Sequence, residues 1–163
     1  MKNQKALHKG FTLIELLVVV AIIGILAAVV LAALGSARNR GGDAAVQSNL
    51  NTVRNQAEIF NSNNGYSYLP KSGSIFSVGP CPAYNANGTN MISRDKQINA
   101  AIVEAVKRGG NGSSCYNSAT AWAVAVGLKT KASNSWCVDA AGKSKLENFA
   151  PNAAINAATG ACK

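Results

Sequence analysis

The sequence is poor in the side chains that enzymes use for acid–base and nucleophilic chemistry. Its 163 residues include one histidine, His8, and seven acids. A Ser–His–Asp or Cys–His arrangement would have to use this histidine, which precedes a long apolar run. Six acids follow that run without the spacing of a catalytic carboxylate pair, and we interpret them as solvated surface residues: Asp43, Glu58, Asp95, Glu104, Asp139 and Glu147. The composition therefore predicts that the protein is not an enzyme.

Closely spaced metal-binding residues are also lacking. The four cysteines are separated by 34, 22 and 25 residues, whereas a zinc site usually needs pairs such as Cys-x-x-Cys. The stretches "GKSK" and "RGGNGSS" do not have the spacing of a phosphate-binding loop. We therefore expect no metal and no cofactor. An even number of cysteines beyond the apolar run indicates an oxidising compartment, with three pairings open to Cys81, Cys115, Cys137 and Cys162.

The few acids are outnumbered by sixteen lysines and arginines, which gives a formal net charge of +9. The charge stays positive when the three lysines at the N-terminus are set aside. Such a balance favours association with nucleic acid or an anionic surface, but most of the basic residues are scattered. Two close pairs stand out as candidate DNA contacts, Lys129 with Lys131 and Lys143 with Lys145.

One long apolar run dominates the N-terminal part of the chain. From Phe11 to Leu34 it is interrupted only by Thr12, Glu15 and Gly24. As a helix it would be about 36 Å long, which is enough to cross a bilayer. The lysines before it predict that the N-terminus stays in the cytoplasm and that the C-terminal part is exported. A cleaved secretory signal would have a shorter apolar core that ends at a small-residue cleavage site.

Glu15 is the one charged residue inside this run. An acid at the centre of a span costs about 2.5–3.5 kcal/mol on insertion scales, and less near its end. A plain membrane anchor therefore gives no reason for Glu15. The alternative is that its carboxylate reaches the membrane interface from a position near the end of the span.

The residues Lys9-Gly10-Phe11-Thr12-Leu13-Ile14-Glu15, followed by the apolar run, resemble the class III signal of type IV pilins and pseudopilins. The resemblance implies that prepilin peptidase cuts between Gly10 and Phe11 and that Phe11 is then N-methylated. His8 would leave with the leader. Three parts result: a cleaved leader (1–10), a transmembrane and filament-core helix (11–34), and a periplasmic or extracellular head (35–163).

The same resemblance implies a life history and a role for Glu15. A single-pass, N-in precursor in the cytoplasmic membrane becomes a subunit of an extracellular, homo-oligomeric helical filament with the help of the pilus assembly machinery. In the family the acid is thought to pair with the new amine of the neighbouring subunit, because opposite charges compensate each other in a low dielectric. Phe11, Thr12 and Glu15 are thus the candidate assembly residues. Many family members have a proline where this chain has Ala32, so we expect a straighter helix.

Beyond the apolar run, a helical pattern continues. Apolar residues spaced by four, three, four and three positions predict one buried stripe: Val46, Leu50, Val53, Ala57 and Phe60. Gly41-Gly42 is a weak spot or hinge in this pattern. The segment Asn63–Gly65 predicts the end of a single helix of about 50 residues, whose first half is membrane-spanning and whose second half is amphipathic.

The rest of the chain predicts a small antiparallel sheet, so the expected fold class is α+β and pilin-like. A short strand is expected near Ile75–Val78 and a helix over Arg94–Lys107, with Ser93 as N-cap and Gly109 as its stop. A hairpin follows in "ATAWAVAVGLKT" and "SNSWCVDAAGKSK", closed near Lys131–Asn134. A further strand at Lys143–Leu146 would give three or four strands laid on the long helix.

The order of these elements favours the disulfides Cys81–Cys115 and Cys137–Cys162, and the second resembles the C-terminal disulfide loop of many pilins. The leading function is a structural subunit of a type IV pilus-like filament. The alternatives are a DNA-binding minor pilin of a competence or uptake pilus and a type II secretion pseudopilin. Four cysteines and no acidic loop favour a pilin over a pseudopilin. DNA and host surfaces are further candidate partners.

Overall fold

The computed structural model describes residues 11–163. The chain divides after Ala37 into two compact units, and the unit Arg38–Lys163 forms the head. Helix α1, Leu13–Asn63, contributes to both units as one element of 51 residues. This confirms the predicted long helix, and Gly41-Gly42 does not interrupt it. Among the described residues α1 is one helix that is long and apolar enough to cross a membrane.

The apolar run is exposed in the part of the chain that the structure describes. Its large side chains are all exposed, from Phe11, which is 90% exposed, to Leu34, which is 41% exposed. Burying one such side chain is worth about 1.5–3 kcal/mol, so this surface strongly favours lipid or other helices over water.

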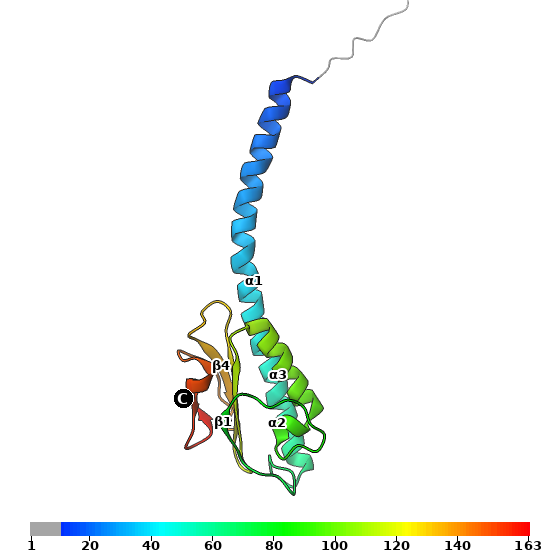
Figure 1. Ribbon diagram of the computed structural model, residues 1–163, viewed down its shortest axis with the longest axis vertical. Helices are drawn as coiled ribbons and strands as arrows, with labels where there is room; N and C mark the ends of the chain where they lie inside the picture. The colour runs from blue at the N-terminus through cyan, green and yellow to red at the C-terminus, as the bar shows by residue number, and fades with distance from the viewer. Residues whose placement is uncertain (1–10) are drawn as a thin grey trace, which may run out of the picture. The chain divides into compact units, whose positions relative to one another are not determined.

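The C-terminal part of α1 builds the head's core. Val46, Leu50, Val53 and Ala57 are fully buried, and Phe60 packs against them in part, as the predicted stripe requires. The stripe contacts helix α3, Lys96–Gly109, and one face of a sheet. In Figure 1 the cyan part of α1 and the green α3 lie side by side on that face.

The sheet has five antiparallel strands in the order β1-β2-β3-β4-β5. Their bounds are Phe76–Gly79, Ser113–Asn117, Trp122–Gly127, Ser135–Asp139 and Ser144–Glu147. The predicted hairpin is β3–β4, and the predicted strands near Ile75–Val78 and Lys143–Leu146 are β1 and β5. The prediction of three or four strands was wrong because it lacked β2. That strand contains three polar residues among five and pairs Cys115 with Val124.

A C-terminal segment that the sequence did not reveal covers the second face of the sheet. It consists of α4, Pro151–Ala154, and the two-residue strands β6, Ile155–Asn156, and β7, Ala161–Cys162. Ala123 and Ala125 are buried beneath Ala154 and Ile155. This segment, red in Figure 1, lies on the side of the sheet away from α3. The central strand β3 is therefore buried on both faces, and its alanines leave room for the cover.

Helix α3 begins and ends at different caps from those expected. Asp95 is the N-cap, since its Oδ1 accepts hydrogen bonds from the backbone N–H groups of Gln97 and Ile98, both at 2.9 Å. Ser93 instead lies in the one-turn helix α2, Met91–Arg94. At the other end Gly110, with φ of 79°, is the left-handed cap, and Gly109 is the last helical residue. The carboxylate of Asp95 satisfies two backbone donors that a serine at position 93 cannot reach.

Both disulfides in the structure join elements of the head. Cys81 is bonded to Cys115 on β2, with 4.8 Å between the Cα atoms. Cys137 on β4 is bonded to Cys162 on β7, with 5.9 Å between the Cα atoms. This is the pairing that the order of elements favours. The first bridge ties the long connection after β1 to the sheet, and the second ties down the C-terminal segment.

Three of the acids interpreted as solvated are buried: Asp43, Asp139 and Glu147. Asp43 on α1 accepts hydrogen bonds from the backbone N–H of Lys129 at 2.6 Å and of Thr130 at 3.3 Å, and from the Thr130 hydroxyl. Its partners lie more than eighty positions away in the sequence, so no local pattern shows them. By contrast Glu104 is partly exposed, and its hydrogen bond to Arg108 lowers its pKa.

Replacing Asp43 by Ala removes the acceptor that holds the β3–β4 loop on α1. We expect the free energy of unfolding of the head to fall by about 2–3 kcal/mol, because backbone donors lose a charged partner. Chemical denaturation of the oxidised, detergent-solubilised chain measures this loss through its tryptophan fluorescence. Glu104→Gln is the matched control and should change stability by less than about 0.5 kcal/mol. Equal effects of the two substitutions would contradict the role of Asp43.

Tyr68 generates a prediction at high pH. Its side chain is 7% exposed, and its hydroxyl donates to Glu58 Oε1 at 2.8 Å. Burial, and then the neighbouring carboxylate, raise the pKa of Tyr68 from 10.0 to about 12. The folded state thus favours the neutral phenol. Its contribution to stability is complete below pH 10 and is lost as the pH rises towards 12.

A comparison of Tyr68→Phe with the natural chain tests this. The difference in unfolding free energy between the two should shrink between pH 10 and about 12, since only the natural chain loses the contribution of this phenol. Denaturation at a series of pH values measures the difference. A difference that does not vary with pH would show that Tyr68 ionises equally in the folded and unfolded chain.

Candidate functional site

The segment Phe11–Glu15 begins α1 with a reciprocal cap. Thr12 donates its backbone N–H to Glu15 Oε2 at 2.8 Å and its hydroxyl to the same oxygen at 2.7 Å. In return the Glu15 backbone N–H donates to the Thr12 hydroxyl oxygen at 3.3 Å. Thr-x-x-Glu is a capping box, which satisfies backbone donors that the first helical turn leaves free. Sequence analysis named Thr12 and Glu15 but missed this local role, although their spacing carries the signal.

The cap uses only part of the Glu15 carboxylate. All its hydrogen bonds in the described chain go through Oε2, which leaves Oε1 available. Within residues 11–163 no basic side chain forms an ion pair with Glu15. Phe11, 90% exposed, stands directly before the cap. The start of α1 therefore presents one uncompensated carboxylate beside the position where cleavage would create an amine. Gly10, the other side of that predicted cleavage, lies outside the described residues.

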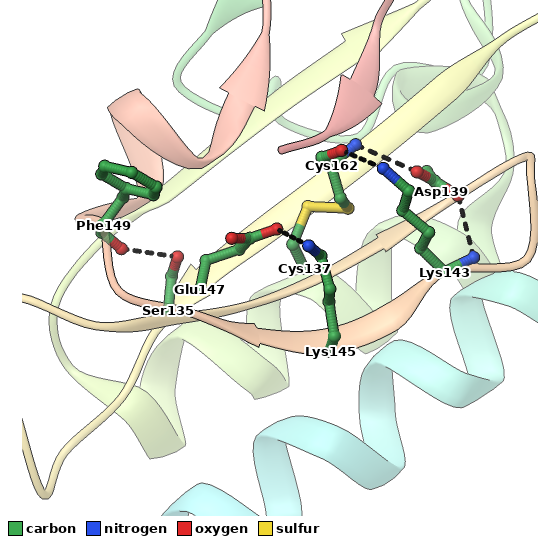
Figure 2. Close-up of polar contacts among 8 residues, drawn as sticks. All are labelled: Ser135, Cys137, Asp139, Lys143, Lys145, Glu147, Phe149 and Cys162. Carbon is green, nitrogen blue, oxygen red and sulfur yellow. Dashed lines mark hydrogen bonds and ion pairs between the residues drawn. A yellow bond between two sulfur atoms is a disulfide. The ribbon is translucent and has the colours of Figure 1, made fainter.

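The C-terminal disulfide is braced by polar contacts (Figure 2). Asp139 Oδ2 accepts a hydrogen bond from the backbone N–H of Cys162, and its Oδ1 accepts one from the backbone N–H of Lys143, both at 3.0 Å. The Lys143 Nζ donates to the Cys162 carbonyl at 2.6 Å. Asp139 is 2% exposed, so these bonds fix the β4–β5 turn and the end of the chain to each other.

The four lysines proposed as DNA contacts lie on different elements around β4. Lys129 and Lys131 lie in the loop before β4, Lys143 lies in the turn after it, and Lys145 lies on β5 opposite Cys137. The length of β4 separates the first pair from Lys143 by about 15 Å. Figure 2 shows that both lysines of the second pair have partners within the head. Lys143 donates a hydrogen bond to the Cys162 carbonyl, and Lys145 forms an ion pair with Glu147 at 3.2 Å.

Lys129 instead joins basic residues that sequence analysis did not select. It lines a cleft together with Arg38 on α1 and with Lys107 and Arg108 at the end of α3. We call these four side chains the basic cleft. Its members come from three separate stretches of sequence, so their grouping is a property of the fold.

Two comparisons with known proteins found matches. The family model described as the prokaryotic N-terminal methylation motif matches residues 5–31. The type IV wide pilus major component PilA4 of Thermus thermophilus is 45% identical over 71 residues, which cover 44% of this chain and 53% of that protein. The chain thus spans about half the length of this relative. No solved structure matches the chain.

Of these matches, the one to the methylation motif includes the carboxylate cap and much of the apolar run of α1. They confirm the resemblance that the residues Lys9–Glu15 carry. A long N-terminal helix packed on a small antiparallel sheet agrees with it. By its methylation motif, its pilin relative and its fold, the chain is similar to the type IV pilins.

Proposed function

We propose that the chain is a structural subunit of a type IV pilus-like filament. In this proposal the precursor sits in the cytoplasmic membrane with its N-terminus inside, and prepilin peptidase cuts it between Gly10 and Phe11. After N-methylation of Phe11, the subunit is extracted and packs through residues 11–34 into the filament. The observation that carries the proposal is the exposed apolar surface of α1 between Phe11 and Leu34, with a single carboxylate at its start.

The apolar face of α1 has to be covered either by lipid or by neighbouring helices. A helix this apolar is stable in lipid, and exchange of lipid for neighbouring helices keeps its side chains out of water. The exchange costs little in apolar contacts, so it provides little register along the filament axis. A charged pair provides register, because a displacement of one turn leaves both charges unpaired in a low dielectric.

Glu15 is suited to this pairing by its own cap. Oε2 is held by Thr12, which fixes the carboxylate at the start of the helix, while Oε1 remains available for the Phe11 amine of another subunit. One carboxylate thus serves two partners, its own backbone and a neighbouring chain. Thr12 belongs in the assembly segment because it orients Glu15.

The head carries no feature that requires chemistry of its own. Its two disulfides and the contacts of Asp139 hold a rigid five-stranded unit. A rigid head suits a filament coat that must survive outside the cell. The contacts of Lys143 and Lys145 within the head support structural subunit over DNA-binding minor pilin as the first choice.

Processing is tested on filaments sheared from cells. Intact-mass measurement of the subunit should show loss of Met1 to Gly10, a gain of one methyl group and four oxidised thiols. A bulky substitution, Gly10→Leu, should leave the full-length precursor in the membrane, because it replaces the Gly after which the peptidase is proposed to cut. Recovery of the uncut chain in sheared filaments would overturn the proposed processing.

The charge of Glu15 is tested separately from its cap. Glu15→Gln keeps an acceptor for Thr12, since Gln also serves in a capping box, but it removes the charge. We expect the yield of sheared filaments to fall about a hundredfold or more, because breaking a buried ion pair costs about 3–5 kcal/mol. Immunoblots of the membrane fraction should show unchanged precursor.

Thr12→Ala is the matched control for that experiment. It weakens the cap by about 1 kcal/mol and keeps the carboxylate charged, so filament yield should fall much less than with Glu15→Gln. If Thr12→Ala abolishes filaments while Glu15→Gln assembles normally, the acid acts through the cap and the proposed ion pair is wrong.

A further inference from the structure

The basic cleft is a concave site of about 440 Å³ in the head. It is lined by Arg38, Lys107, Arg108 and Lys129, together with Gly41 and Gly42. No acidic side chain lines it. A surface that gathers only positive side chains around a hollow has the shape and charge to receive an anionic group.

The cleft has three sides: α1, the end of α3 and the β3–β4 loop. Two glycines allow these elements to approach one another. A Cβ on Gly42 would lie 3.1 Å from the Arg108 carbonyl oxygen and 3.6 Å from Lys129 Cδ. A Cβ on Gly109 would lie 2.0 Å from the Gly127 carbonyl oxygen, so a side chain there would push α3 away from β3. Gly42, one residue of the pair that looked like a hinge in the sequence, therefore lets the end of α3 and the β3–β4 loop approach α1.

Asp43 fixes the β3–β4 loop, which forms the third side of the cleft. By binding the backbone N–H groups of Lys129 and Thr130, it anchors the β3–β4 loop one helical step from Gly42. Its carboxylate accepts hydrogen bonds from these donors, and Asp43 as a residue is 8% exposed. The Lys129 side chain is exposed at the cleft, held at its backbone but free at its ammonium group in the described chain.

The charges of the cleft are only partly compensated. Glu104 accepts from Arg108 Nε at 2.7 Å and lies 3.9 Å from Lys107 Nζ. This contact uses one edge of the Arg108 guanidinium and leaves its terminal nitrogens for another acceptor. In the described part of the chain no carboxylate lies within ion-pair distance of Arg38 or Lys129. The cleft thus keeps an excess of positive charge.

The place of the cleft along α1 indicates which anion meets it. Arg38 follows Leu34, the last residue of the apolar run, by four positions of continuous helix. That is about 6 Å, similar to the depth of the head-group layer on one side of a bilayer. An arginine at this position, in the membrane-inserted precursor, lies where lipid phosphates lie.

We propose that the basic cleft binds the phosphate of an anionic phospholipid at the outer face of the membrane while the precursor awaits extraction. The inference rests on the proposed function, because it needs α1 to be inserted in a bilayer. Arg38 and Arg108 offer planar groups that bind phosphate oxygens in pairs, and Lys129 adds a point charge. Lipid bound here would seat the head on the membrane and would have to leave when the subunit enters the filament.

The test uses the full chain in uncharged maltoside micelles, isotopically labelled for backbone amide NMR. Short-chain phosphatidylglycerol is titrated in, with short-chain phosphatidylcholine in a parallel titration. We expect phosphatidylglycerol to shift the amides of Gly41, Gly42 and Lys129 saturably, and phosphatidylcholine at equal concentration to leave them in place.

Two triple variants of equal charge complete the design. Arg38→Gln, Arg108→Gln and Lys129→Gln together should weaken the phosphatidylglycerol affinity about tenfold or more. Lys71→Gln, Lys96→Gln and Lys131→Gln remove the same charge from exposed positions outside the cleft and should keep the natural affinity. Equal loss in both variants would mean general attraction to net positive charge and would overturn the proposed site.

Two further arms identify the source of the phosphate. Soluble glycerol phosphate that shifts the same amides with the same affinity as the lipid would overturn a lipid site, as would double-stranded DNA that displaces phosphatidylglycerol. Membrane extraction of cells distinguishes the two proposals. If the chain is embedded in the membrane and assembles, but its cleft does not bind phosphatidylglycerol, this inference alone is wrong. If the chain is never embedded in the membrane, the proposed function is wrong as well.

Discussion

An exposed helix surface that is apolar on all sides, with one carboxylate at its start, constrains everything else in this protein. The exposed side chains between Phe11 and Leu34 are unfavourable in water and favour lipid or other helices around them. In the proposed function this segment passes from lipid to neighbouring helices. Because both surroundings are equally apolar, the register of the filament would have to come from charge, and Glu15 is the one charged side chain in this segment.

The head is constructed so that the second half of α1 is held firmly. The stripe of Val46, Leu50 and Val53 packs on one face of the sheet, and the C-terminal segment closes the other face. The Cys137–Cys162 bridge and Asp139 fasten that cover. Burial on both faces explains why strand β3 alternates large residues with alanine: the large ones fill the α1 side, and the small ones admit the cover.

Much of this fold could be predicted from local periodicity. The long helix, its buried stripe, the β3–β4 hairpin and the position of β5 follow from patterns of three to four and of two residues. The caps of α3 could not be assigned with the same certainty, since Ser93 and Asp95 are both good N-caps and only the chain path selects Asp95. Strand β2 was missed because polar residues hide its pattern, and Cys115 is buried there by its partner strand.

Part of the candidate site could likewise be predicted from the sequence, and part could not. Glu15 and its neighbours were visible because the motif is local. The burial of Asp43 and the grouping of Arg38, Arg108 and Lys129 were not, because they depend on contacts between α1, α3 and the β3–β4 loop that only the folded chain creates. The distribution of the four candidate lysines has the same origin, since the loop before β4, the turn after it and strand β5 carry them.

The central claim is that the Phe11 amine of one subunit meets the Glu15 carboxylate of another. Solid-state NMR on filaments grown from a mixture of subunits tests it directly, with ¹⁵N at Phe11 in one population and ¹³C at the Glu15 carboxylate in the other. The account predicts magnetisation transfer between the two labels, which can arise only between chains. Absence of this transfer, in filaments where the same labels placed in one chain do show it, would contradict the account.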